Sequence, residues 1–134
     1  AVGCLGVSNV TREQLETLLQ HAKVPPAVVQ NRCYANMRWD RDVRDLCRER
    51  GIVYQGFSLL TANRREMAHP ALRAIATRRS MTPSQVVFRF ALDVGMIPLT
   101  GTTDPEHMKE DLAVAELPPL DDEELHVIES LGRP

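Results

Sequence analysis

The sequence predicts an α/β fold in which short parallel strands alternate with helices. Four short apolar segments recur along the chain, at residues 3–7, 25–30, 52–57 and 96–100. Between them, apolar residues recur every three or four positions, as on one face of a helix. The apolar segments do not alternate with polar residues, which is typical of strands covered on both faces of a sheet. Strands connected by helices run parallel, with right-handed crossovers.

The first predicted unit is a strand at residues 3–7 followed by a helix. Thr11 is a suitable N-cap, and Gln14 three residues later completes a capping box. The helix then presents one apolar face, made of Leu15, Leu18, Leu19 and Ala22.

The second unit begins at residues 25–30, where prolines occur only at the entry to the strand. Gly51 stands where a left-handed residue commonly ends a helix. The helix before it has an apolar stripe of Trp39, Val43, Leu46 and Cys47.

The third unit has a strand at 52–57 and two helices. Pro70 begins the first of them, and Thr82 with Gln85 forms a capping box for the second, which Gly95 ends. The apolar stripes are Leu72, Ile75 and Ala76 in the first helix and Val86, Phe90 and Val94 in the second.

The last unit has a strand at 96–100 and a helix that opens at Asp104-Pro105. We expect this helix to turn Met108, Leu112 and Ala115 inward. A final amphipathic helix covers 120–132, and its acidic first turn, Asp121–Glu124, suits the positive end of the helix dipole.

Composition excludes several classes of function. The 134 residues suit one domain, and 16 Lys+Arg against 18 Asp+Glu give a net charge of -2, which favours neither a nucleic-acid nor a membrane-surface partner. No apolar run approaches the ~20 residues that span a bilayer. Cys4, Cys33 and Cys47 form no CxxC pair, and the four histidines have no ligand-like spacing, so we expect reduced thiols, no metal and a cytoplasmic protein.

Polar and aromatic residues follow each predicted strand. In parallel α/β folds, ligands bind beyond the carboxyl ends of the strands. Amides and hydroxyls can hold a carboxamide, a ring can stack on a heterocycle, and the N–H groups of a helix start can hold phosphate. The set suits a nucleotide cofactor better than acid–base chemistry. Its members are Ser8, Asn9, Gln30, Asn31, Phe57, Ser58, Leu60, Thr61, Thr100, Gly101, Thr102, Thr103 and the Asp104-Pro105 helix start.

Each of these residues, taken singly, also fits a structural role. Ser8 and Asn9 are typical of turns and caps, Phe57 of a core, and Gly101 of a turn. Four polar strand ends in one chain favour a ligand site over four unrelated loops.

Four blocks in series resemble the C-terminal half of an aldo-keto reductase. They are "LGVSNVTREQLETLL", "PPAVVQNRCY", "RDLCRERGIVYQGFSLL" and "TPSQVVFRFALDVGMIPLTGTTDPEHMKEDL". The resemblance implies half of a TIM (β/α)8 barrel plus a C-terminal helix, with residues 1–134 as a single partial domain. It also implies a nicotinamide cofactor, NADPH or NADH, and the reduction of aldehydes or ketones to alcohols.

The resemblance assigns cofactor roles to individual residues. Ser8, Asn9 and Gln30 correspond to the group that holds the nicotinamide carboxamide. Phe57 replaces a tyrosine that stacks on the nicotinamide ring. The pyrophosphate would contact Ser58 and Leu60, and the adenosine phosphate would be wrapped by Thr100, Gly101 and Thr102.

The chain departs from the family at the adenosine phosphate. Leu99 stands where the family often has a lysine, and His107 lies near the position of its phosphate-binding arginine. The Glu-Asn that follows in the family corresponds to Glu110 and Asp111. Two cations are therefore missing, which weakens the preference for NADPH over NADH.

The family's catalytic Asp, Tyr, Lys and His belong to the first half of the barrel and have no counterpart in this sequence. The resemblance therefore implies that the chain alone is inactive and needs the other half to act on a small carbonyl substrate.

Two other interpretations remain open: a non-enzymatic half-barrel that pairs with itself or with another half-barrel, and a small nucleotide-binding module. The outer strands, at 3–7 and 96–100, carry no charge, so self-association through their edges is expected.

Overall fold

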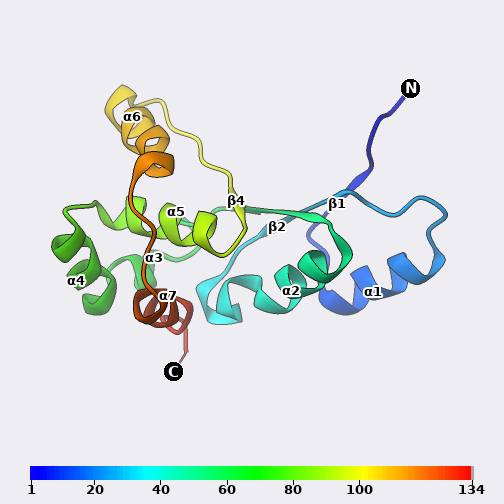
Figure 1. Cartoon of the computed structure of the whole chain (residues 1–134), viewed down its shortest axis with the longest axis horizontal. Helices are drawn as coiled ribbons and strands as arrows, with labels where there is room; N and C mark the ends of the chain where they lie inside the picture. Colours follow the sequence, from blue (N-terminus) through cyan, green and yellow to red (C-terminus); the bar gives the residue numbers. More distant parts are fainter. Residues whose placement is uncertain (134) are drawn as a thin grey trace.

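The structure, a computed structural model, describes residues 1–133 as a four-stranded parallel sheet with helices between the strands (Figure 1). The strands lie in the order of the sequence, β1-β2-β3-β4. They are β1 (Gly6–Ser8), β2 (Val28–Arg32), β3 (Val53–Phe57) and β4 (Ile97–Pro98). The helices are α1 (Arg12–His21), α2 (Arg41–Arg50), α3 (Arg64–Met67), α4 (Pro70–Arg79), α5 (Pro83–Asp93), α6 (Pro105–Ala113) and α7 (Asp122–Glu129), with 3₁₀ turns η1 (Ala35–Asp40) and η2 (Val114–Glu116).

The predicted helix starts are confirmed. Thr11 accepts the backbone N–H of Gln14, and Thr82 accepts that of Gln85, with the glutamine side chain returning to the cap in both cases. Asp121 forms a third capping box. These caps satisfy N–H groups that a helix leaves without partners, so each fixes where its helix begins.

The strands and one helix differ from the sequence prediction. β1 and β4, which have only three and two residues, are the edge strands, and each is paired with one neighbour only. Trp39 does not belong to α2: it lies in η1 with a left-handed φ of 53°. Its ring is still buried, so the predicted apolar position is correct although its backbone is not helical.

The core is joined at Trp39, which links three elements that are distant in sequence. Its indole N–H donates to the carbonyl of Ile128 in α7 at 2.8 Å. Its ring lies 5.5 Å from that of Phe90 in α5, in a tilted arrangement. Burying such a ring with its N–H satisfied stabilises a core strongly, so η1, α5 and α7 form one packed unit.

The sheet is covered by helices on one face only. Val29 and Tyr54 point into the helical layer and are almost wholly buried. Alternate residues face the other side, which we call the open face: it carries Val28, Gln30, Arg32, Val53, Gln55 and Phe57, all at least partly accessible. Val53 is 43% exposed. The expectation of strands covered on both faces is therefore wrong for this chain.

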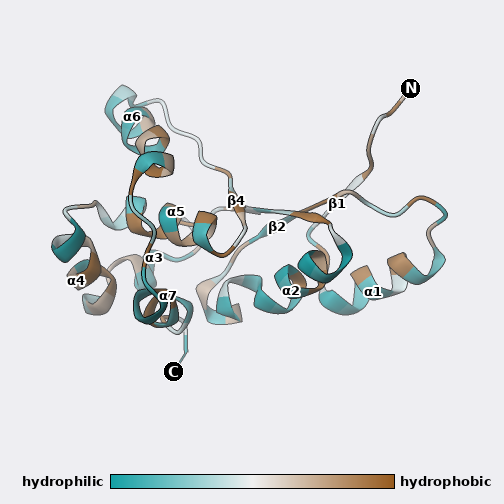
Figure 2. Cartoon of the chain, viewed as in Figure 1, coloured by the Kyte–Doolittle hydropathy of each residue, from teal (hydrophilic) through white to brown (hydrophobic). Residues whose placement is uncertain are grey.

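Helix α6 corrects a second expectation. Met108 and Leu112 are 45% and 79% exposed, and Ala115, in the following turn η2, is exposed too, so the predicted inward face is largely accessible to solvent in the described chain. With Ile97 of β4 they line an apolar groove of about 570 Å³. Figure 2 shows the hydrophobic colouring around β4 and on part of α6, in contrast to the largely hydrophilic α2.

Helix α7 is fastened to α4 by a buried carboxylate. Glu124 accepts hydrogen bonds from Arg78 at 2.6 Å and from Arg79 at 2.5 Å, and it is 2% exposed. Burial alone would raise the pKa of Glu124, but the hydrogen bonds from Arg79, Arg78 and the Asp121 backbone outweigh it and lower the pKa to about 2.

The three cysteines are free, and Cys33 and Cys47 are buried. Within residues 1–133, none of the helices combines the length and the apolar character needed to cross a bilayer.

Replacing Glu124 by Gln should lower the free energy of unfolding by about 3 kcal/mol at pH 7, because two arginines lose their buried anion. A depressed pKa stabilises the fold above the unfolded-state value near 4.3, and this contribution disappears as the pH falls towards 2. Denaturant unfolding of both proteins at pH 7, 5, 3 and 2 should show the difference shrinking. Glu123→Gln, at an exposed neighbour in the same helix, is the control. An undiminished difference at pH 2 would refute this account.

The chain should also self-associate, because β1 and β4 leave uncharged edges and Ile97 is 45% exposed. Light scattering should show a mass that rises with concentration. Leu5→Lys with Ile97→Lys should reduce this rise, whereas Ala74→Lys on the surface of α4 should leave it unchanged. A well-folded monomer over a wide concentration range would contradict the prediction.

Candidate functional site

Three neighbouring strands bring the first group of predicted site residues together at the carboxyl ends of the strands. Ser8 is the register partner of Gln30, and Phe57 is the partner of Arg32. The hydroxyl of Ser8 donates to the backbone carbonyl of Gln30 at 2.7 Å, and the backbone N–H of Asn9 donates to the same oxygen at 3.0 Å. Ser8, Asn9 and Gln30 are therefore adjacent, as the parallel register requires.

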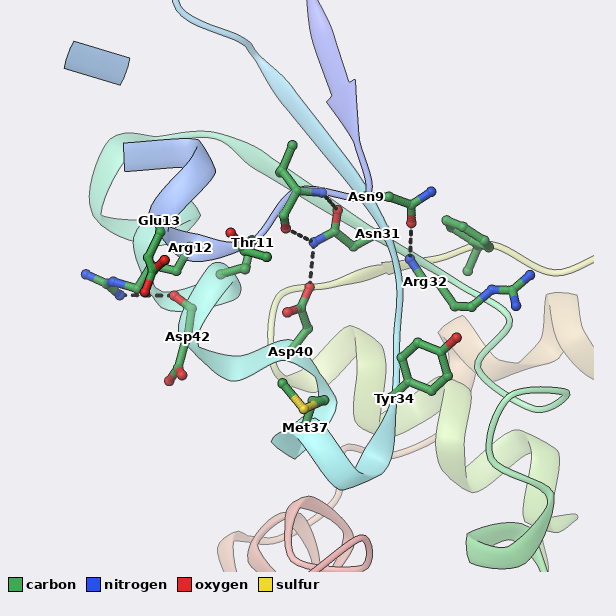
Figure 3. Close-up of a pocket in the computed structure, with 13 residues that line it drawn as sticks. Asn9, Thr11, Arg12, Glu13, Asn31, Arg32, Tyr34, Met37, Asp40 and Asp42 are labelled. Carbon is green, nitrogen blue, oxygen red and sulfur yellow. Dashed lines mark hydrogen bonds between the residues drawn. The ribbon is translucent and has the colours of Figure 1, made fainter. Parts of the chain in front are cut away.

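Asn9 turns the chain at the end of β1. Its φ of 53° is left-handed, a conformation in which Asn is among the best tolerated side chains. Its Oδ1 accepts the backbone N–H of Arg32 at 3.1 Å (Figure 3). The side-chain oxygen is thus used to hold β1 beside β2, while its Nδ2 has no hydrogen-bond partner within residues 1–133 and is available to a ligand.

Gln30 is oriented by a residue that the sequence analysis did not name. Its Nε2 donates to Oε1 of Gln55 on β3 at 3.0 Å, and both lie in one row of the open face. Its Oε1 accepts nothing from the described part of the chain, so it is free to accept from a ligand amide. Gln55 could have been recognised as a polar residue two positions before Phe57, on the same face of an otherwise apolar strand.

Phe57 and Ser58 form the end of β3. The ring of Phe57 is half-buried, and the guanidinium carbon of Arg32 lies 5.6 Å from its centroid. Ser58 has a left-handed φ of 56°, which bends the chain sharply away from the sheet. Non-glycine residues in this conformation are uncommon and cluster at functional sites, and here Asn9 and Ser58 directly follow the ends of β1 and β3, the two strands that flank β2.

The loop after Ser58 is held by Asn63, a second residue that sequence reasoning missed. Its Nδ2 donates to the carbonyls of Cys33 and Leu59 at 2.9 and 2.8 Å, and its Oδ1 accepts the N–H of Ala35 at 2.8 Å. Asn63 is 2% exposed, so these bonds are shielded from water. The predicted contact residues Ser58 and Leu60 therefore sit on a fixed loop.

Two clefts adjoin at Phe57. The first, of about 730 Å³, is lined by Asn9, Arg32, Tyr34 and Phe57 among others (Figure 3). The second cleft, of about 340 Å³, extends from the end of β3 to the end of β4. Its lining includes Phe57, Ser58, Leu60, Thr61, Thr100 and Gly101.

The segment after β4 differs from the expectation of free N–H groups at a helix start. Asp104 caps α6, and its carboxylate accepts the N–H groups of Glu106 at 2.8 Å and His107 at 3.4 Å. These hydrogen bonds lower the pKa of Asp104, which is therefore an anion where a phosphate was expected. The expectation of free N–H groups is therefore wrong for these two groups, whereas phosphate binding at this helix start stays a prediction.

Acidic side chains surround the remaining predicted residues of this segment. Thr100 donates its hydroxyl to Asp111 at 3.1 Å, and Thr102 accepts the N–H of Asp104. Lys109 pairs with Glu106 at 2.9 Å. His107 is exposed, Gly101 borders open space, and Glu110 uses its backbone carbonyl to accept from Gln85.

The structure therefore groups the predicted residues in two sets. Ser8, Asn9 and Gln30 are adjacent by register and hydrogen bonds, but only Asn9 of these three lines the first cleft. Phe57 lines both clefts and connects the first to Thr100 and Gly101 in the second. Thr102, His107 and Glu110 line neither of these two clefts. Figure 1 shows α6 and α1 toward opposite ends of the molecule.

The ionisable groups beneath the sheet have structural roles. The hydroxyl of Tyr54 donates to Asp40 at 2.6 Å, and Asn31 donates to the same oxygen at 2.8 Å. Burial raises the pKa of Tyr54 and raises that of Cys33 to about 12, so both stay protonated near neutral pH. Over the described residues, no three His, Cys, Asp or Glu side chains gather as a metal would need.

Comparison with known proteins identifies relatives along the whole chain. The model of the Aldo/keto reductase family matches residues 1–133. The chain is 34% identical to the (1S)-1,7-diacetoxy-luvungin A aldo-keto reductase of Citrus sinensis, over 95% of this chain and 41% of that protein. It is 34% identical to deoxymugineic acid synthase 1 of Oryza sativa subsp. japonica, over 82% of this chain and 36% of that protein.

A solved structure supports the same relationship. The aldo-keto reductase of the silkworm Bombyx mori, in complex with NADPH, superposes with a TM-score of 0.83 at 25% identity, over 96% of this chain and 42% of that one. The chain spans about two fifths of the length of these relatives. A parallel α/β fold and a family match from end to end agree, and this chain belongs to the aldo/keto reductase family.

Proposed function

We propose that this chain is the cofactor-binding, C-terminal half of an aldo-keto reductase barrel, and that the enzyme reduces aldehydes or ketones with NADPH or NADH. The main support for the proposal is that Ser8, Asn9, Gln30 and Phe57 lie close together at the carboxyl ends of β1, β2 and β3. Family membership and the NADPH complex of the silkworm relative support a nicotinamide cofactor.

The residues present fit the nicotinamide end of such a cofactor. The free Nδ2 of Asn9 can donate to a carboxamide oxygen, and the free Oε1 of Gln30 can accept from its amide. Phe57 offers a ring for stacking. The bound cofactor would supply a hydride, while these side chains would hold and orient the nicotinamide ring at the carboxyl ends of the strands. Ser58 and Leu60, on the loop fixed by Asn63, would contact the pyrophosphate.

The adenosine end fits a 2′-phosphate less well. Asp104 caps α6 with a carboxylate, Asp111 holds Thr100, and Leu99 provides no charge. Anions at this position repel a phosphate and are compatible with the free hydroxyls of NADH. Thr100, Gly101 and Thr102 would therefore wrap the adenosine end without the strong preference for NADPH that cations at this position would give.

The proposed site lacks a tyrosine paired with a lysine as proton donor, because Tyr34 lines the first cleft but no lysine does. Tyr54 is buried and donates to Asp40 on the helical side of the sheet. A positioned general acid contributes about 10²–10⁴-fold to such a reduction. In this proposal the proton comes from the other half of the barrel, and the small carbonyl substrate is positioned for reaction only when that half is present.

A non-enzymatic half-barrel is the second candidate. The open face and the exposed groove beside α6 favour it, because both present apolar surface to solvent. In that case the chain would pair with a copy of itself or with another half-barrel. A small nucleotide-binding module is a third possibility, favoured by the paired clefts at Phe57.

The isolated chain should bind NADH and NADPH with dissociation constants in the range of tens of micromolar or weaker, about −6 kcal/mol, because part of the cradle is missing. The two affinities should be similar. Leu99→Lys should favour NADPH by about fivefold, since a partly exposed cation adds roughly 1 kcal/mol towards a phosphate. Calorimetric titration tests this, and submicromolar binding with a strong preference for NADPH by the unaltered chain would refute it.

The chain alone should not consume NADPH with an aromatic aldehyde, whereas adding the N-terminal half of a related reductase should restore turnover. Asn9→Asp in the mixture should weaken cofactor binding about tenfold, because it removes the Nδ2 donor and keeps both the oxygen that accepts from Arg32 and the left-handed backbone. Ala74→Lys is the matched surface control. Turnover by the chain alone would overturn the split-site proposal, and no turnover with both halves folded would favour the non-enzymatic half-barrel.

A further inference from the structure

Arg32 occupies an unusual position beside the proposed nicotinamide site. It is the last residue of β2 and lies on the open face, two residues after Gln30. Its register partner on β3 is Phe57, and its guanidinium carbon lies 5.6 Å from the centre of that ring. A permanent positive charge therefore lies at the ring on which the nicotinamide is proposed to stack.

The guanidinium of Arg32 has no partner in the described chain. Within residues 1–133, no carboxylate oxygen lies within 4.0 Å of it, and its side-chain N–H groups donate to no protein acceptor. The backbone N–H alone is used, by Asn9. A guanidinium placed over a ring keeps its N–H donors in its own plane, so they stay available to a ligand.

Two of the other charged side chains of the first cleft, Asp40 and Arg12, are engaged elsewhere, whereas the carboxylates of Glu13 and Asp42 have no partner within residues 1–133. Asp40 accepts from Tyr54 and Asn31. Arg12 pairs with Glu16 and donates to the backbone of Asp42. Figure 3 shows Arg12, Glu13 and Asp42 at the opposite end of the cleft from Arg32.

Two exposed side chains with large apolar parts complete the Arg32 end of this cleft. Tyr34 and Met37 are 39% and 67% exposed and come from the segment that follows β2. Both line the first cleft together with Arg32 and Phe57. The cleft thus offers a fork of five donors beside apolar surface, a combination that suits a carboxylate attached to a hydrophobic body.

We infer that the carbonyl substrate carries a carboxylate and that Arg32 binds it, next to the ring held by Phe57. This inference rests on the proposed function, because that function locates the nicotinamide at Phe57. In the reduction the carbonyl carbon gains a hydride, the carbonyl oxygen gains a proton, and the carboxylate is unchanged. Arg32 is a specificity-determining residue that holds the acid while Tyr34 and Met37 contact the hydrophobic part.

A purely structural role for Arg32 makes a different prediction. If the guanidinium only supported the Phe57 ring, its loss would affect acidic and neutral substrates equally. Carboxylate binding instead predicts a loss confined to the acid, and partial rescue by lysine, which keeps the charge without the bidentate fork.

A titration of the chain by itself tests the binding step without catalysis. Benzoate should cause a saturable NMR shift of the Arg32 side-chain N–H, whereas methyl benzoate should bind about tenfold more weakly. Arg32→Gln should lose this difference, and Arg73→Gln, an exposed arginine of α4, should keep it. Absence of a saturable shift, or an equal response at Arg73, would overturn the inference whatever the cofactor titrations show.

The second test uses the chain mixed with the N-terminal half. The KM for 4-carboxybenzaldehyde should be about tenfold below that for its methyl ester, with similar kcat, since the carboxylate contact is present in ground and transition states alike. Arg32→Gln should abolish the KM difference and Arg32→Lys should restore part of it. Equal effects on acid and ester would assign Arg32 to support of Phe57 and refute the inference. If neither substrate is turned over, the proposed function fails and the NMR titration alone decides the role of Arg32.

Discussion

The parallel pairing of β1, β2 and β3 in one register is the constraint on which the rest of the site depends. Because Ser8 is paired with Gln30, and Gln30 with Gln55, three polar side chains form a single row across the sheet. A shift of one residue in any strand would turn these side chains into the helical layer, where amides without partners are costly. Successive side chains of a strand point to opposite faces of the sheet, and this alternation determines both the core and the site. Val29 and Tyr54 face the helical layer and are buried, whereas Gln30 and Gln55 face the open side.

The strand ends are held by asparagines. Asn9 joins β1 to β2 through the backbone of Arg32, Asn31 donates to Val10 and Asp40, and Asn63 closes the loop after β3. Each satisfies backbone or carboxylate groups that would otherwise be unpaired in a loop. A cofactor site requires such rigidity, because amide and ring contacts lose affinity when the groups that make them must first be ordered. These hydrogen bonds also hold the left-handed turns at Asn9 and Ser58 in place.

The one-sided sheet connects the architecture to the proposed function. Trp39, Phe90 and Ile128 provide a well-packed helical layer, whereas Val53 and Ile97 face solvent on the open face and at its edge. A domain normally buries both sides of a parallel sheet, so the open face indicates a surface that a further layer should cover. In the proposed function, this further layer supplies the general acid, while the cofactor contacts come from this chain.

Local patterns in the sequence determined the order of strands and helices, the capping boxes at Thr11 and Thr82, and the polar strand ends, because each depends on residues only a few positions apart. The family resemblance added the proposed cofactor roles. The tertiary structure decided what depends on distant neighbours: the coverage of one face alone, the exposure of the apolar face of α6, and the contacts made by Gln55, Asn63 and Arg32. Periodicity shows that a residue belongs to a face, but whether anything packs against that face is decided by segments far away in the chain.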